Sequence, residues 1–117
     1  MKKLIRKVNF QDLNGVLRLL YQLSPQDGQT SVGKLERVFS CMLNNPDYYL
    51  NVCDSDGELL GTSTLFIQQN LTQGGRPVGH IGNVVVDENF RGKGIDKLLV
   101  TALIRVASQI GCYKTIL

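Results

Sequence analysis

Apolar residues recur along this chain at two spacings, about two residues and about three to four, and together they predict eight regular elements. Residues 2–8 alternate loosely between polar and apolar side chains and predict a first strand. Asn9 follows in the position of a helix N-cap, so a helix is expected over about 10–22. Its apolar positions fall on one face: Leu13, Val16, Leu17 and Leu20.

A second helix is predicted from Thr30 or Ser31, which are both good caps, to about Asn45. The dipeptide Asn45-Pro46 ends it, because the residue before a proline disfavours the helical conformation. We expect this helix to bury Val32, Leu35, Phe39, Met42 and Leu43.

A hairpin follows, with strands over 48–53 and 59–69 on either side of the sequence DSDGE, whose Asp and Gly are typical of a turn. Residues 70–77, NLTQGGRP, read as a loop. The next segment, HIGNVVV over 80–86, is an almost continuous apolar run. Such a run is typical of a strand that is covered on both faces.

The polar connection DENFRGKG leads into the clearest helical periodicity of the chain, over 95–110, and Gly111 ends that helix. Residues 113–117, YKTIL in sequence, predict a last strand. The helix is expected to bury one stripe of residues: Ile95, Leu98, Leu99, Ala102, Leu103, Val106, Ala107 and Ile110.

The predicted order β-α-α-β-β-β-α-β indicates an α/β architecture, with hairpins first and one strand–helix–strand crossover at the end. A chain of 117 residues is long enough for a single core, so one domain over 1–117 is expected. The last strand would expose unpaired main-chain groups together with Ile116 and Leu117. We therefore expect something to cover that edge.

Composition and charge narrow the function only a little. The sequence is 43% hydrophobic, and it has neither an apolar stretch long enough for a membrane span nor a signal-peptide core, so a cytoplasmic location is expected. The net charge of +3 suits an anionic small molecule as well as it suits nucleic acid. The three cysteines form no CxxC pair, and the sequence has a single histidine, His80, that could complete a metal site with them. Buried free thiols are therefore expected at Cys41, Cys53 and Cys112.

The informative segment is VVVDENFRGKGIDKLL, from Val84 to Leu99, which runs from a buried strand through a tight turn into a helix. At such a turn several backbone N–H groups lack internal partners, and the helix dipole adds partial positive charge. Gly92 and Gly94 let an anion approach the main chain, while Arg91 and Lys93 supply positive charge around it. The segment therefore predicts a phosphate or pyrophosphate cradle.

Two other phosphate motifs do not fit this turn. A P-loop needs a longer loop and a hydroxyl after the lysine, and the dinucleotide fingerprint GxGxxG would need glycine where Lys97 stands. On the residues alone, a plain turn with a solvated basic edge remains the alternative.

The same segment resembles the acetyl-CoA signature of the GNAT N-acetyltransferases, Gln/Arg-x-x-Gly-x-Gly/Ala, with Arg91, Gly94 and Asp96 at its three defined positions. Residues 70–99 and the final GCYKTIL are similar to bacterial small-amine acetyltransferases and to glucosamine-6-phosphate N-acetyltransferases. The resemblance implies the GNAT fold: a mixed, mostly antiparallel sheet flanked by helices.

It also implies acetyl-CoA as cosubstrate and no metal. The pyrophosphate would lie on the N–H groups of Arg91, Gly92, Lys93, Gly94, Ile95 and Asp96. The pantetheine arm would lie along Val84, Val85 and Val86, where this strand splays from the strand YKTIL. In the family a neutral amine attacks the thioester directly, while a base or an ordered water takes the proton.

The sequence departs from the family pattern at two residues of this segment. Asp96 stands where glycine or alanine is usual, and it either points outward in the first helical turn or occupies some of the free N–H groups itself. Gly82 stands where related sequences often carry an acidic residue, a candidate base. Asn83 is a negligible base, and His80 is the one histidine nearby. A strand-end or loop histidine without a catalytic role is the favoured interpretation of His80.

The resemblance also implies a further helix and a closing hairpin that this sequence lacks, so either a fragment or a truncated protein that dimerises through its last strand is expected. The leading functional reading is an N-acetyltransferase for a primary amine of a small molecule. The alternative is a degenerate GNAT domain that binds CoA or a protein partner without turnover. Nucleic-acid binding is not favoured, because no aromatic residues stand among the basic ones.

Overall fold

The protein is seen in a computed structural model, which describes residues 2–25 and 30–117. Its centre is a five-stranded sheet in the order β1-β2-β3-β4-β5. Neighbouring strands are antiparallel from β1 to β4, and β5 runs parallel to β4. The strands are β1 (Leu4–Lys7), β2 (Tyr48–Ser55), β3 (Glu58–Gln68), β4 (Val78–Val86) and β5 (Lys114–Ile116).

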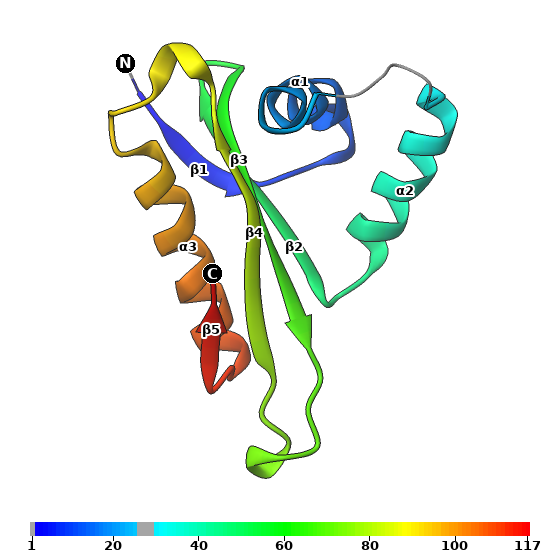
Figure 1. Ribbon diagram of the computed structural model, residues 1–117, viewed down its shortest axis with the longest axis vertical. Coiled ribbons are helices and arrows are strands. Elements are labelled where there is room, and N and C mark those ends of the chain that lie inside the picture. Colours follow the sequence, from blue (N-terminus) through cyan, green and yellow to red (C-terminus); the bar gives the residue numbers. More distant parts are fainter. Residues whose placement is uncertain (1, 26–29) are drawn as a thin grey trace.

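Helices cover both faces of this sheet (Figure 1). The helices α1 (Leu13–Leu23) and α2 (Val32–Asn44) lie on one side, and α3 (Ile95–Ile110) lies on the other. Short 3-10 turns occur at Phe10–Asp12, Gln73–Gly75 and Glu88–Phe90. The β3–β4 hairpin extends beyond the helices at the narrow end of the molecule (Figure 1).

The element order and the mixed, mostly antiparallel sheet confirm the architecture expected from the sequence. The helix over 95–110 has the predicted bounds, and Gly111 caps it with a left-handed φ of 102°. Ser31 caps α2, since its side chain accepts a hydrogen bond from the Lys34 N–H. Asn9 is also a cap, but of the 3-10 turn that precedes α1.

The strand boundaries need small corrections. The strand expected over 80–86 begins at Val78, because Val78 and Gly79 still pair with the end of β3. It is not covered throughout, since Gly82 and Asn83 are exposed. The last strand is shorter than 113–117 and comprises Lys114–Ile116.

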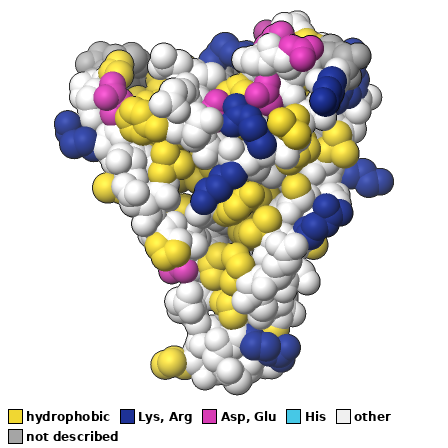
Figure 2. Space-filling view, turned by 180° about the vertical axis from the view of Figure 1, so that it is seen from behind, with side chains coloured by type: hydrophobic (Ala, Val, Ile, Leu, Met, Phe, Trp, Pro, Cys, Tyr) yellow, Lys and Arg dark blue, Asp and Glu magenta, His cyan; other side chains and the backbone are white. Residues whose placement is uncertain are grey.

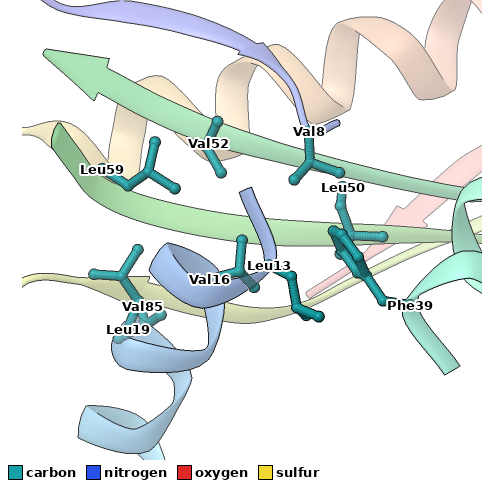
Figure 3. Packing of buried hydrophobic residues seen from close by; sticks show 9 residues of the cluster. All are labelled: Val8, Leu13, Val16, Leu19, Phe39, Leu50, Val52, Leu59 and Val85. Atoms are coloured by element: carbon teal, nitrogen blue, oxygen red, sulfur yellow. The ribbon is translucent and has the colours of Figure 1, made fainter. Parts of the chain in front are cut away.

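One core cluster lies between the sheet and the two N-terminal helices (Figure 3). Leu19 of α1 is fully buried there, and Val85 of β4 belongs to the same cluster. This packing joins α1 to the strand that leads to the predicted cradle. The buried residues of the cluster are Val8, Leu13, Val16, Leu19, Phe39, Leu50, Val52, Leu59 and Val85.

The opposite face of the sheet packs against α3 through two smaller clusters. Asn51 is buried among these residues, and its amide donates to the Leu99 carbonyl at 3.2 Å while its oxygen accepts from the Ser63 hydroxyl. Because a buried amide without partners would be costly, this pairing fixes the height of α3 over β2 and β3. The buried side chains of the two clusters are Cys53, Leu60, Leu65, Ile67, Ile81, Ile95, Leu99, Leu103 and Ala107.

Several side chains that were expected inside are exposed. Val32 is 60% exposed and Cys41 is also exposed, because only the Phe39 face of α2 reaches the sheet. On α3 the buried stripe is narrower than predicted and follows every fourth residue from Ile95 to Ala107. Leu98 and Ile110 therefore face outward, at 45% and 47% exposure.

Candidate functional site

A β-bulge bends β4 at the point where the predicted site begins. Gly82 pairs with Thr64 and Val85 pairs with Thr62, so two residues of β4, Asn83 and Val84, stand opposite one residue of β3. Asn83 takes a left-handed φ of 50°, which is uncommon for a residue other than glycine. The extra residue directs the side chains of Val84 and Val86 toward α3 and that of Val85 toward α1.

The edge of β4 beyond the bulge is open. The strand β5 pairs with Val78, Gly79 and His80 and with no later residue of β4. In the described part of the chain, residues 81–86 therefore have no strand neighbour on that edge. Main-chain groups of an unpaired edge bind extended ligands as a neighbouring strand would. The geometry corresponds to the splay that the resemblance implied.

The turn after β4 presents its backbone in an open conformation. Gly92 and Gly94 have φ values of 78° and 80°, which favour glycine strongly. A β-carbon added at either residue would have no atom within 4 Å, so the space above the main chain is free. Gly94 is the N-cap of α3 and supplies no side-chain cap, so the first N–H groups of the helix lack that partner. Such a turn fits an anion.

A hollow of about 410 Å³ lies between the end of β4 and the start of α3. It joins the open strand edge to the glycine turn, and its volume is within the range of about 300–1,000 Å³ that is typical of small-molecule sites. Its walls are both apolar and polar. The lining residues are Val84, Val86, Phe90, Arg91, Gly92, Ile95 and Asp96.

Six of the nine predicted site residues line this hollow, and three do not. Val85 is 4% exposed and faces the core on the other side of the sheet, so only its main chain is available at the strand edge. Lys93 is exposed, and its ammonium lies 5.6 Å from the centre of the Phe90 ring. Gly94 borders a different hollow, beside Ile5 and Lys97.

Phe90 was missed at the sequence level. It is half-buried, packs beside Ile95 and Leu99, and forms one wall of the hollow. A lone aromatic residue within a polar connection gave no periodic signal. The usable signal was its position directly before Arg91, where a large side chain at the end of a short turn faces the helix that follows.

Arg91 is held in place by the strand. Its Nε donates a hydrogen bond to the Val86 carbonyl at 3.1 Å. The guanidinium therefore uses one of the main-chain acceptors at the end of β4 and places its remaining N–H donors at the rim of the hollow. A positive charge fixed in this way attracts an anionic ligand.

Asp87 lies at the junction of strand and turn and is 4% exposed. Its carboxylate accepts the Asn89 N–H at 2.9 Å and lies 2.6 Å from Nη1 of Arg18. The hydrogen bond from the Asn89 N–H, followed by the Arg18 contact, holds the pKa of Asp87 below its ordinary value against the effect of burial. The carboxyl group of Asp87 is therefore ionised at neutral pH in this conformation of the turn.

Asp96 is exposed at the edge of the hollow. Within residues 2–25 and 30–117, its carboxylate accepts no hydrogen bond from the N–H groups of the turn. This arrangement agrees with an outward-pointing Asp96 that complements the helix dipole, rather than with a carboxylate that plugs the cradle.

The positions considered for proton transfer lie earlier in β4, at His80 and Gly82. The Nε2 of His80 lies 2.6 Å from the Gln68 side-chain oxygen, and its ring is 6.3 Å from the ring of Phe66. Gly82 is exposed, and a β-carbon there would meet no atom within 4 Å. The site thus brings a binding turn and an open strand edge together, with no carboxylate at position 82.

Comparison with known proteins shows which family has a sequence like that of this strand edge, turn and helix. The Acetyltransferase (GNAT) family matches residues 15–117, which is most of the chain. The chain belongs to this family. The match confirms the resemblance drawn from the acetyl-CoA signature, and it includes both the glycine turn and the splayed strands of this GNAT domain.

Relatives and solved structures point the same way. The glucosamine 6-phosphate N-acetyltransferase of Trypanosoma brucei brucei is 48% identical over 61 residues, or 52% of this chain and 42% of that protein. The chain thus spans less than half of that relative's length. The Arabidopsis thaliana glucosamine 6-phosphate N-acetyltransferase is 31% identical over 97% of this chain and 78% of its own length. A crystal structure of glucosamine-6-phosphate N-acetyltransferase from Arabidopsis thaliana superposes with a TM-score of 0.90 at 30% identity, covering 99% of this chain and 81% of that one.

No helix within residues 2–25 and 30–117 combines the length and apolar character that a membrane crossing requires. Across the same residues, no three His, Cys, Asp or Glu side chains gather in a way that could hold a metal ion.

Proposed function

We propose that this GNAT domain is an acetyl-CoA-dependent N-acetyltransferase that acts on a primary amine of a small molecule. The observation that carries the proposal is one continuous feature: the open edge of β4 leads directly into the glycine turn at Gly92 and Gly94, at the start of α3. An elongated ligand with an anionic diphosphate and an amide-bearing arm matches both parts. The family match and the glucosamine-6-phosphate relatives support this reading.

The binding residues follow from that geometry. The diphosphate would accept hydrogen bonds from main-chain N–H groups between Arg91 and Asp96, with the Arg91 guanidinium at the rim. The amides of the pantetheine arm would pair with the open edge of β4 over 84–86, as an additional strand does. Ile95 and Phe90 supply the apolar wall. Lys93 contributes charge rather than a wall of the hollow, since it is not among the lining residues and its ammonium lies over the Phe90 ring.

The proposed reaction depends mainly on main-chain groups and a water, and little on side chains. The neutral amine attacks the thioester carbonyl carbon, so that a C–N bond forms, the C–S bond breaks, and the CoA thiolate leaves and takes up a proton from solvent. Main-chain N–H groups near the strand bulge, where Gly82 and Asn83 are exposed, would stabilise the developing oxyanion. With glycine at position 82, the proton passes to solvent through an ordered water instead of a local carboxylate.

Glucosamine 6-phosphate is the acceptor that we place first. Both relatives described above carry that substrate in their names. The net charge of +3 favours an anionic sugar phosphate over a polycationic acceptor. On the face of the molecule that Figure 2 shows, lysine and arginine side chains are spread over the surface, while acidic ones gather mostly at the broad end.

A free-thiol assay tests the function. The protein would be mixed with acetyl-CoA and a panel of amines that includes glucosamine 6-phosphate, glucosamine, polyamines and a peptide amine. Cys41 is exposed, so thiol release has to exceed the protein concentration severalfold, and mass spectrometry should find the acetylated product. Turnover with a small amine is expected. CoA binding without turnover on any amine would favour the alternative, a domain that binds CoA without catalysis.

We also propose that a second copy covers the free edge of β5. Ile116 is 42% exposed and Leu117 is 78% exposed, next to a strand edge without a partner in the described structure. Pairing two such edges would satisfy the main-chain groups and bury both side chains. Light scattering is expected to give twice the chain mass, and a monomer at all concentrations would contradict this arrangement.

A further inference from the structure

The turn of the candidate coenzyme site, over 87–94, is hydrogen-bonded to α1 through two side chains of that helix. These side chains lie one helical turn apart. Arg18 donates from Nη1 to the Asp87 carboxylate at 2.6 Å and from Nη2 to the Leu59 carbonyl at 2.7 Å. Gln22 accepts the Glu88 N–H at its side-chain oxygen at 2.9 Å. Residues at this spacing share one face of a helix, so a single face of α1 holds both of the first two residues of the turn.

Asp87 is the point where these contacts converge. Its own N–H donates to the Leu60 carbonyl at 2.8 Å, and its carboxylate caps the 3-10 turn by accepting the Asn89 N–H. The Arg18 guanidinium holds the same carboxylate from the other side. The side chain of Asp87 is 5% exposed, so without Arg18 its carboxylate would remain buried with one hydrogen bond and without its salt bridge.

The far end of the turn is anchored in another way. Arg91 donates a hydrogen bond to the Val86 carbonyl, and Ile95, the first residue of α3, is buried against the sheet. The N–H groups between these anchors belong to a segment that borders the hollow through Gly92. Their positions therefore depend on where the first residues of the turn are fixed, and α1 fixes them.

We infer that Arg18 and Gln22 are positioning residues for the coenzyme turn: from outside the hollow, they set the conformation in which its N–H groups point at the diphosphate. The inference rests on the proposed function for its consequence, since only coenzyme binding makes the orientation of those groups matter. It differs from ordinary packing of α1, which the core side chains Val16 and Leu19 already provide.

A matched pair of variants tests this role. Arg18→Met removes the charge and both hydrogen bonds but keeps an extended apolar stem. Arg6→Met is the control, because Arg6 makes a similar part-exposed ion pair with Asp12 and Asp54 that does not touch the turn. Arg18→Lys retains a charge for Asp87 without a fork that can also reach Leu59. Gln22→Ala removes the second contact alone.

Two measurements separate positioning from general stability. Hydrogen exchange of the amides over 87–94, without ligand, is expected to accelerate in Arg18→Met and not in Arg6→Met. The dissociation constant for CoA is expected to rise about tenfold in Arg18→Met, the size of one charge-assisted hydrogen bond, and to rise less in Arg18→Lys. The KM for acetyl-CoA should rise with it, while the KM for the amine stays near that of the wild type.

The outcomes are distinct. If the wild type bound no CoA, the proposed function would fail, and the exchange measurement would still decide whether α1 orders the turn. Exchange in Arg18→Met equal to that in Arg6→Met would overturn the inference even with CoA binding intact. If Arg18→Met does not fold, Arg18→Lys and Gln22→Ala carry the same test, and unchanged exchange in both would overturn it.

Discussion

Gly61 of β3 lies directly beneath Leu99 of α3. A β-carbon at Gly61 would come within 3.0 Å of Leu99 Cδ1 and of the Val85 carbonyl oxygen, and within 3.2 Å of Ile95 Cγ2. The absence of a side chain at this position lets α3 approach the sheet, and with it the first turn of the helix that borders the hollow. Gly61 therefore affects both the packing of α3 on the sheet and the position of the first turn of α3 beside the hollow.

Gly61→Ala is expected to destabilise the protein by about 1–3 kcal/mol, because the neighbouring atoms include backbone that cannot move away. Urea denaturation followed by circular dichroism measures this. Gly82→Ala is the control, since a β-carbon at Gly82 meets nothing within 4 Å. It should change stability by less than about 0.5 kcal/mol. Equal losses in the two variants would contradict the packing argument.

Gly82→Glu is expected to increase turnover. The position is open and exposed on β4, so the longer side chain can be accommodated without a clash. A carboxylate there could take the amine proton directly or through one water, and such bases contribute about 10²-fold or more. We expect kcat to rise at least about tenfold, with a new ascending limb in the pH profile of kcat. Gly82→Gln has the same shape without the base, and an equal increase in that variant would exclude base catalysis.

Asp96→Gly is expected to tighten the binding of acetyl-CoA. A carboxylate about 5 Å from a diphosphate charge costs on the order of 3 kcal/mol at an effective dielectric constant of 20. Asp96 is exposed, so solvent and salt screen most of this, and a gain of about tenfold is expected. Asp96→Asn removes the charge at constant size and should bind nearly as well as Asp96→Gly.

Titration calorimetry at low and high salt completes that test. The advantage of both variants over the wild type should shrink at 1 M salt, where the Debye length is about 3 Å. Identical dissociation constants in all three proteins would mean that the carboxylate does not sense the coenzyme.

Local sequence signals were enough to predict the elements that depend on neighbours in the chain. The bounds of α3 followed from its periodicity and from Gly111, and the glycine turn followed from Gly92 and Gly94 at a helix start. Both depend on residues within a few positions of one another. The order of strands and helices was equally local.

Features that depend on distant residues could not be predicted in this way. The bulge at Asn83 depends on the register between β3 and β4, which is a property of two strands. Arg18 and Asp87 are 69 positions apart, and nothing near either residue marks the other. The exposure of Val32 depends on how little of α2 reaches the sheet. Each of these is fixed by tertiary packing.

Asp87→Asn is expected to cost about 1 kcal/mol of the free energy of unfolding at pH 7, after the partial exposure of Arg18 is allowed for. The folded protein holds the pKa of Asp87 below its ordinary value, chiefly through the Asn89 N–H and Arg18. Stability from this group is therefore complete above the unfolded pKa of about 4 and is lost as the pH falls through the lower folded pKa. Because the wild-type carboxyl is itself protonated in strong acid, the difference between the variant and the wild type should shrink there.

Urea denaturation at pH 7, 4 and about 2 measures this difference. Asp12→Asn is the matched control: the Arg6 guanidinium lowers the pKa of Asp12 in the same direction, but that carboxylate lies away from the turn. Both variants should lose the same kind of acid-sensitive stability, and only Asp87→Asn should also weaken CoA binding. A cost of Asp87→Asn that did not change with pH would mean that the ionised carboxylate does not hold the turn.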